Sequence, residues 1–251
     1  MKKILFVVCT HGDELSGFNL FLKYPYGKNN KTEWEVVLGN PEAAFLNTRF
    51  IESDLNREGA VTKAITYEQK RSLLLKEKMK SFDVVYDIHT TTAIRDNPIW
   101  NRCIFVNSLE KGVIDAIFYV KKSYVIYDSD PLINKQYITA NHPVGITLEY
   151  VKHPNIKATQ NHISNDFFSI INEKHNSSNH IFLEFERSVS QKEKSKLNIN
   201  FKEFFPLSTK EKKLLNLPSG SGYYPVFVNP PEIDPKYYCF LNKKIDGRKR
   251  K

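Results

Sequence analysis

The 251-residue sequence predicts an α/β protein, in which a domain built on a mostly parallel sheet is followed by a smaller β-rich domain. Strand-like apolar runs alternate with segments of helical spacing through about residue 175, as in repeated βαβ units. The composition then changes at 175–179, His-Asn-Ser-Ser-Asn. Beyond this point, turn signals such as Pro230-Pro231 replace most of the helical spacing. We therefore expect domains at residues 1–175 and 176–251.

Each expected element has a local signal. Runs rich in Val, Ile and aromatic residues predict strands at 4–9, 34–39, 82–88, 103–106, 124–127 and 144–151. Apolar residues at helical spacing predict helices at 15–23, 42–46, 66–79, 109–119 and 156–174. The helix at 66–79 has the clearest start, because Thr66 can cap it and Glu68 and Gln69 occupy its first turn. In the second domain we expect a strand at 180–186 and a single short helix at 209–215.

The composition argues against several classes of protein. No apolar run approaches the ~18–20 residues that a membrane-spanning helix needs, and the short run after Lys3 is interpreted as a core strand, not a signal peptide. The net charge of +9 comes with no nucleic-acid-binding motif, so we expect neither a membrane nor a nucleic acid as partner. Cys9, Cys103 and Cys239 are widely spaced, which favours buried, reduced thiols in a cytoplasmic protein. The oligomeric state stays open.

Two of the expected strands lead into side chains that bind metals. His11 and Glu14 follow the first strand, and His89 ends the strand at 82–88. In open α/β sheets, sites form at the carboxyl ends of the strands. A His-x-x-Glu pair alone would more often be a solvated loop, but two His and one Glu match a catalytic zinc that keeps one position open. We therefore expect one Zn²⁺ per chain.

Two further features are ambiguous in the sequence alone. Arg49, Asn56 and Arg57 lie in one polar segment and could clamp a carboxylate, since Arg donates paired hydrogen bonds. The alternative is a solvated loop with surface ion pairs. Glu149 lies in an otherwise apolar strand, where an unpaired buried charge would be costly. A nearby metal ion would account for it, and exposure at the strand end is the alternative.

Several separated motifs occur in one order along the chain. They are His11-Gly12-Asp13-Glu14, Asn40-Pro41, Arg49, Asp54-Leu55-Asn56-Arg57, Asp87-Ile88-His89-Thr90-Thr91-Thr92 and Glu149. In this order they resemble the aspartoacylase and succinylglutamate desuccinylase family, zinc-dependent amidohydrolases with the zinc-carboxypeptidase fold. The segment 224–229, Tyr-Pro-Val-Phe-Val-Asn, resembles the C-terminal β domain of aspartoacylase. The resemblance implies an α/β/α sandwich around a central mixed sheet.

The resemblance also implies roles at the metal. His11, Glu14 and His89 would bind the zinc, and Asp54 would accept a hydrogen bond from His11. Glu149 would be the general base of the reaction.

The remaining matched residues would act on the substrate, a small molecule that bears a carboxylate. Arg49 would polarise the scissile carbonyl and stabilise the oxyanion, while Asn56 and Arg57 would hold the carboxylate. The implied reaction is hydrolysis of an amide bond in an N-acyl amino acid or a similar small acylated amine. The alternatives are a metallocarboxypeptidase acting on a peptide and a metal-containing binding protein without turnover.

One family feature is missing from the sequence. The arginine expected shortly before the catalytic Glu has no match in 137–142, Tyr-Ile-Thr-Ala-Asn-His. Unless Arg95 or Arg102 replaces it, Arg57 and Asn56 can hold one carboxylate. We therefore expect a substrate with a single carboxylate and an uncharged side chain.

Overall fold

The structure, a computed structural model, describes most of the chain. The described residues are 1–91, 101, 103–121, 124–130, 135–152, 155–176, 180–197, 199, 201–202, 204–226, 228 and 237–246. Arg95 and Arg102, the two residues considered as replacements for the missing arginine, lie outside them.

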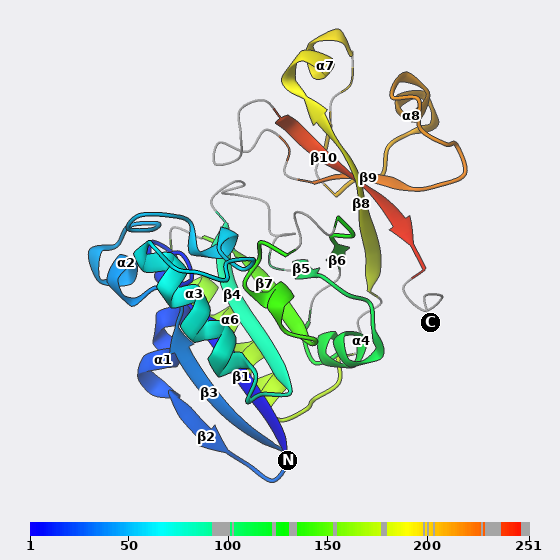
Figure 1. The fold of residues 1–251 in the computed structure, drawn as a ribbon. Coiled ribbons are helices and arrows are strands. Elements are labelled where there is room, and N and C mark those ends of the chain that lie inside the picture. The colour runs from blue at the N-terminus through cyan, green and yellow to red at the C-terminus, as the bar shows by residue number, and fades with distance from the viewer. Residues whose placement is uncertain are drawn as a thin grey trace.

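The described strands form one mixed sheet in the order β2-β3-β1-β4-β7-β5-β6-β8-β10-β9 (Figure 1). They are β1 (Lys2–Val8), β2 (Tyr26–Lys28), β3 (Thr32–Leu38), β4 (Val84–Thr91), β5 (Cys103–Val106), β6 (Tyr124–Tyr127), β7 (Gly145–Val151), β8 (Ile181–Ser190), β9 (Tyr223–Val226) and β10 (Tyr237–Ile245). Strands β3, β1, β4 and β7 run parallel to one another, whereas β5 is antiparallel to β7. The predicted central mixed sheet is confirmed.

Helices flank the N-terminal part of this sheet on both faces (Figure 1). The α-helices are α1 (Phe18–Lys23), α2 (Pro41–Leu46), α3 (Tyr67–Met79), α4 (Lys111–Ile117), α6 (Ile156–Ile171), α7 (Gln191–Lys196) and α8 (Thr209–Leu214). The short 3-10 helices are η1 (Leu15–Gly17), η2 (Leu55–Arg57) and η4 (Thr139–Asn141). Apolar residues of α1, α4 and α6 pack in the core on one face, and those of α3 and η2 pack on the other.

Successive side chains of β1 point to opposite faces of the sheet, and this alternation produces the core on both faces. Ile4, Phe6 and Val8 point into the cluster beneath α6, while Leu5 and Val7 point into the cluster beneath α3. A strand buried on both faces reads as a continuous apolar run, which explains the prediction of this strand from the sequence.

Helix α3 begins as predicted. The Thr66 hydroxyl accepts a hydrogen bond from the Gln69 backbone N–H, and the Gln69 side chain accepts one from Thr66 N–H, which completes a capping box. Of the adjacent leucines at 73–75, only Leu75 is buried, because neighbouring helical residues point in different directions.

The short strand β2 and the short helix α7 are among the elements that were not predicted. The strand β2 is three residues long and pairs with β3 at the edge of the sheet. The helix α7 shows that the expectation of a single helix in the second domain was wrong. Its sequence, Gln-Lys-Glu-Lys-Ser-Lys, has no apolar residue and none of its residues is buried, so it has no apolar period to detect.

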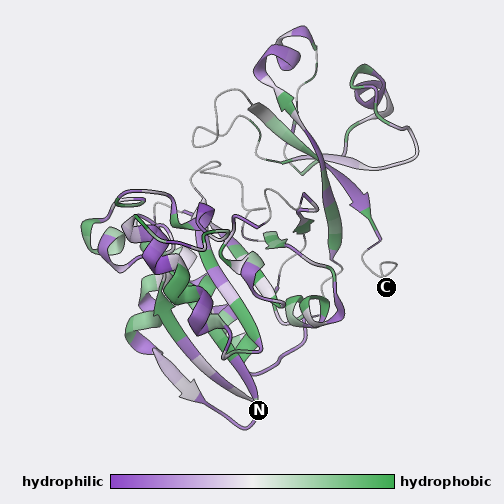
Figure 2. Cartoon of the chain, in the orientation of Figure 1, coloured by the Kyte–Doolittle hydropathy of each residue, from purple (hydrophilic) through white to green (hydrophobic). Residues whose placement is uncertain are grey.

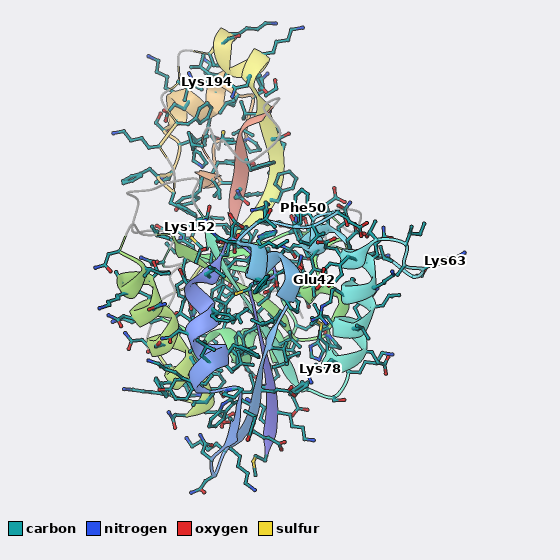
Figure 3. All side chains as sticks on the ribbon, turned by 90° about the vertical axis from the view of Figure 1, so that its left-hand side faces the viewer. Glu42, Phe50, Lys63, Lys78, Lys152 and Lys194 are labelled. Carbon is teal, nitrogen blue, oxygen red and sulfur yellow. The ribbon has the colours of Figure 1, made fainter. Side chains whose placement is uncertain are left out.

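The C-terminal part extends the same sheet. Strand β8 pairs in parallel with β6, and β10 joins β8 to β9 by antiparallel pairing. This part projects away from the N-terminal layers, and its helices α7 and α8 are mostly hydrophilic (Figure 2), with Lys194 of α7 at the far end (Figure 3). The domain boundary at 175/176 stays a prediction. Among the described helices, none combines the length and apolarity needed to span a membrane.

Candidate active site

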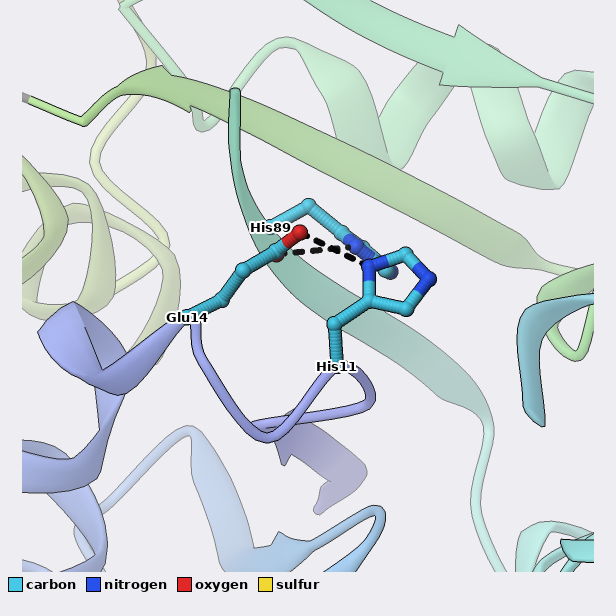
Figure 4. Close-up of side chains that lie close together, drawn as sticks. All are labelled: His11, Glu14 and His89. Atoms are coloured by element: carbon cyan, nitrogen blue, oxygen red, sulfur yellow. Dashed lines mark hydrogen bonds and ion pairs between the residues drawn. The ribbon is translucent and has the colours of Figure 1, made fainter. Parts of the chain in front are cut away.

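The carboxyl ends of β1 and β4 bring His11, Glu14 and His89 together (Figure 4). The Glu14 carboxylate lies between the two rings, with Oε1 2.7 Å from His11 Nδ1 and Oε2 3.1 Å from His89 Nδ1. One potential ligand atom from each residue lies within 4.8 Å of the others, and all three side chains are buried. In the described part of the chain, this is the one group of His, Cys, Asp and Glu side chains with such geometry.

The loop after β1 is shaped by its close fit against α2. Cys9, the buried residue that follows β1, has a φ of 56°, so the chain turns sharply there through a conformation that L-residues rarely adopt. A Cβ atom at Gly12 would lie 2.1 Å from the carbonyl carbon of Ala43, so a side chain could not fit there. Gly12 N–H donates to the Arg49 carbonyl at 3.1 Å, which joins this loop to the segment that carries Arg49.

Each imidazole is also held by an aspartate on its other nitrogen. His11 Nε2 lies 3.0 Å from Asp54 Oδ1, and His89 Nε2 lies 2.9 Å from Asp87 Oδ2. The Thr10 hydroxyl donates to the second oxygen of Asp87 at 2.7 Å. Hydrogen bonds of this kind fix the tautomer and orientation of imidazoles that bind metals. Asp87 was not predicted as a site residue, although residues two apart in a strand share one face.

The histidines and carboxylates of the cluster shift the pKa values of one another. Burial works to raise the pKa of Glu14, but the charges and hydrogen bonds of the two rings hold it below its usual range. Burial works to lower the pKa of His89, but the charges of Asp87 and Glu14, with their hydrogen bonds, raise it well above its usual value. The same balance holds the pKa of Asp54 low, where His11 is the main opposing cause to burial.

The donor set fits a divalent cation. Two imidazole nitrogens and one carboxylate are typical zinc ligands. Glu14, Asp54 and Asp87 carry three negative charges, against the positive charges of Arg49 and of Arg57 near Asp54, so the group is anionic when both rings are neutral. Burying such a charge without a partner is costly, and a divalent ion would offset it.

Arg49 borders this cluster. Its Nη1 lies 3.7 Å from Glu14 Oε1 and its Nη2 lies 3.1 Å from His11 Nε2. Because 41% of its side chain is exposed, its guanidinium can contact both the cluster and a molecule arriving from solvent.

Asn56 and Arg57 lie in η2, which directly follows Asp54. The Asp54 carboxylate caps η2 by accepting from Asn56 N–H at 2.9 Å, so one aspartate contacts both His11 and the start of this turn. The Arg57 guanidinium lies 5.0 Å from the centre of the Tyr137 ring, a cation–π contact. Ile138 N–H donates to Asn56 Oδ1 at 3.4 Å. Tyr137, which begins the segment 137–142 that lacks the expected arginine, was not predicted as a site residue.

Glu149, in β7, lies on the same face of the sheet as His89. It is the register partner of His89 in the parallel pair β4–β7, and paired residues of adjacent strands point to the same face. Its side chain is half-buried. All eight predicted site residues therefore lie around one edge of the sheet, and their individual roles stay predictions.

This fold and cluster define a class of protein: an α/β protein with a buried His–Glu–His group at the carboxyl edge of a mixed sheet. The chain matches the family model described as "Succinylglutamate desuccinylase/Aspartoacylase catalytic domain" over residues 1–164. The chain belongs to this family, which confirms the resemblance inferred from its motifs.

Individual relatives support the same assignment. A probable aspartoacylase of Prochlorococcus marinus subsp. pastoris is 37% identical over 102 residues, which cover 37% of this chain and 35% of that protein. The chain thus spans about a third of the length of this curated relative.

Two solved structures share the fold. Murine aminoacylase 3 superposes with a TM-score of 0.69 at 20% identity, over 97% of this chain and 95% of that one. The succinylglutamate desuccinylase from Chromobacterium violaceum superposes with a TM-score of 0.72 at 14% identity, over 98% and 85%. The predicted fold class is therefore confirmed.

Proposed function

We propose that this chain is a zinc-dependent hydrolase that cleaves the amide bond of an N-acyl amino acid or a similar small acylated amine. The observation that carries the proposal is the buried group of His11, Glu14 and His89, whose rings are each backed by an aspartate, in a chain of this family. These three residues would hold one Zn²⁺ per chain. When bound, zinc supplies Lewis acidity and lowers the pKa of water.

Glu149 and Arg49 perform the remaining chemistry in this proposal. Glu149 accepts the proton of the attacking water and delivers it to the leaving amine, and its position beside His89 supports that role. Arg49 donates hydrogen bonds to the carbonyl oxygen as negative charge develops there. Its contact with Glu14 and its partial exposure support this second role.

Arg57 and Asn56 bind the carboxylate of the substrate. The Tyr137 ring holds the Arg57 guanidinium before substrate arrives, which lowers the cost of ordering it. Because Asn56 Oδ1 accepts from Ile138 N–H, the amide N–H groups of Asn56 are the donors left for a carboxylate.

The first experiment tests both metal and reaction. Elemental analysis of protein purified without added metal should find roughly one zinc per chain, and zinc content unchanged in a His11→Ala, His89→Ala double variant would contradict the ligand assignment. The zinc-loaded protein should release amine from at least one N-acetyl, N-succinyl or N-formyl amino acid. A zinc-saturated protein that is inert toward these compounds and toward peptides would instead be a binding protein.

The substrate class is proposed to carry one carboxylate and an uncharged side chain. The described segment 135–152, which leads into Glu149, contains no arginine to pair with a second carboxylate. We expect kcat/KM for N-acetyl derivatives of neutral amino acids to exceed that for N-acetylaspartate by about 10²–10³-fold, because an unpaired buried charge is heavily penalised. A clear preference for N-acetylaspartate would contradict this, and Arg95→Ala and Arg102→Ala would then be the variants to compare.

A further inference from the structure

We infer that Glu68 is a positioning residue, whose carboxylate holds residues 51–53 so that Arg49, Asp54 and Arg57 lie correctly at the active site. The inference rests on the proposed function only in so far as these residues act on the metal site and the substrate.

Glu68 is fully buried near the start of α3, and each of its carboxylate oxygens accepts two hydrogen bonds. Oε1 accepts from Ile51 N–H at 2.7 Å and from Asn40 Nδ2 at 3.0 Å. Oε2 accepts from Glu52 N–H at 3.1 Å and from Ser53 N–H at 3.2 Å. Burial works to raise the pKa of Glu68, but these hydrogen bonds outweigh it and lower the pKa, so the group is ionised at neutral pH.

The three backbone donors belong to the segment that joins two parts of the candidate site. Arg49 lies two residues before Ile51, and Asp54 directly follows Ser53. Residues 51–53 lie in neither a helix nor a strand, so no regular backbone pattern fixes them. Instead, three successive N–H groups donate to the charged Glu68 carboxylate, and these hydrogen bonds fix the segment.

The fourth donor ties Glu68 to the loop that carries the metal ligands. Asn40 N–H donates to the Cys9 carbonyl at 3.0 Å, and Asn40 Oδ1 caps α2 by accepting from Ala43 N–H at 3.3 Å. Asn40 is itself fully buried. Glu68 therefore sets residues 51–53 relative to the same framework that carries His11.

The next turns of α3 contact the part of the chain that follows Arg57. Ser72 Oγ donates to the Glu58 carbonyl at 2.7 Å, and Lys76 Nζ donates to the Gly59 carbonyl at 2.8 Å. With Glu68 these residues are spaced four apart, so they form one polar row on the helix. Ser72 is as buried as Glu68 but contacts the chain after Arg57, which makes Ser72→Ala a matched control.

The test variant is Glu68→Gln, which keeps the size of the side chain but offers N–H groups where two backbone or amide donors need an acceptor. We expect the zinc content of this variant to match wild type, and its kcat/KM to fall about 10–100-fold, since small misplacements of positioned groups are costly. Ser72→Ala should stay within about twofold of wild type in kcat/KM at temperatures where both proteins are folded. Equal losses in the two variants, or wild-type kinetics in Glu68→Gln, would overturn the inference.

A double variant separates positioning from general stability. If Glu68 acts by placing Arg49, adding Glu68→Gln to Arg49→Ala should cost much less than it costs in the wild-type background. If the losses in kcat/KM of the two single variants were fully additive in the double variant, Glu68 would not act by placing Arg49.

Hydrogen exchange of peptides covering residues 50–57 tests the inference without any substrate. Exchange should accelerate about tenfold or more in Glu68→Gln and not in Ser72→Ala. Unchanged protection in Glu68→Gln would overturn the inference even if the wild-type protein proved active. If the wild type hydrolysed no acylated amino acid, the proposed function would fail while this measurement still decided the role of Glu68.

Discussion

The cluster of His11, Glu14 and His89 and the loop of residues 49–57 meet at one edge of the sheet but are built in different ways. His89, Asp87 and Glu149 belong to buried parallel strands, and the register of β4 and β7 alone puts them on one face. The loop contains the single turn of η2, and its backbone N–H groups donate hydrogen bonds to side chains such as Glu68, which hold it in place. The two regions contact each other through Asp54 and Arg49, which reach His11 and Glu14 from the loop. We expect changes in Glu149 and Asp87 of the strands to affect turnover or metal binding, and a change in Arg57 of the loop to affect substrate binding.

The largest effect is expected from Glu149→Gln, which removes a proton acceptor from the sheet side. Turnover should fall about 10²–10⁴-fold, the usual contribution of a general base. Zinc content and substrate KM should change little, because neither the ligands nor the loop are touched. Steady-state kinetics combined with metal analysis measure this. A near-normal rate would place the base elsewhere, and Asp13 would be the first residue to test.

A smaller effect is expected from Asp87→Asn, which weakens the support of His89. Zinc affinity should fall about 10–100-fold, as it does when partners of metal-binding histidines are removed. Competition with a chelator measures the affinity. Asp83→Asn is the control, because Asp83 is exposed near the other end of the strand and accepts a hydrogen bond from Lys3 N–H at 2.7 Å. An equal loss of affinity in both variants would contradict the role of Asp87.

The smallest of the three effects is expected on the loop side, from Arg57→Lys. The charge remains, but the planar pair of donors and the stacking on Tyr137 are lost, so substrate KM should rise about tenfold. Zinc affinity should be unchanged. Arg187→Lys provides the control, since Arg187 donates a pair of hydrogen bonds to the Glu193 carboxylate, at 3.0 and 3.1 Å, in the C-terminal part. A fall in zinc affinity in Arg57→Lys would contradict the assignment of Arg57 to substrate binding.

The sequence predicted the parts of the fold that have a strong local pattern of apolar residues. The strands β1, β4 and β7 carry long apolar runs, and His11, Glu14 and His89 lie at the carboxyl ends of β1 and β4. The strand β2 and the helix α7 escaped prediction because one is three residues long and the other has no apolar face.

Within the candidate site, the unpredicted residues are those that act through long-range contacts. Glu68 read as an ordinary acidic residue in the first turn of a helix, since nothing in the sequence brings Ile51 N–H to it. Tyr137 is 80 residues from Arg57, and only the tertiary structure brings its ring to the guanidinium. Asp87 was within reach of prediction, because it alternates with His89 along one strand.

The parallel pairing of β6 with β8 also bears on any attempt to shorten the chain. β6 is four residues long, and Val125 and Ile126 within it are buried, with Ile126 paired to Leu183 of β8. A chain cut at the predicted boundary would turn β6 into a bare outer strand with apolar side chains and unsatisfied backbone groups, and such edges recruit other chains into aggregates. We therefore expect the pairing of β8 to protect the edge of β6 from pairing with other chains.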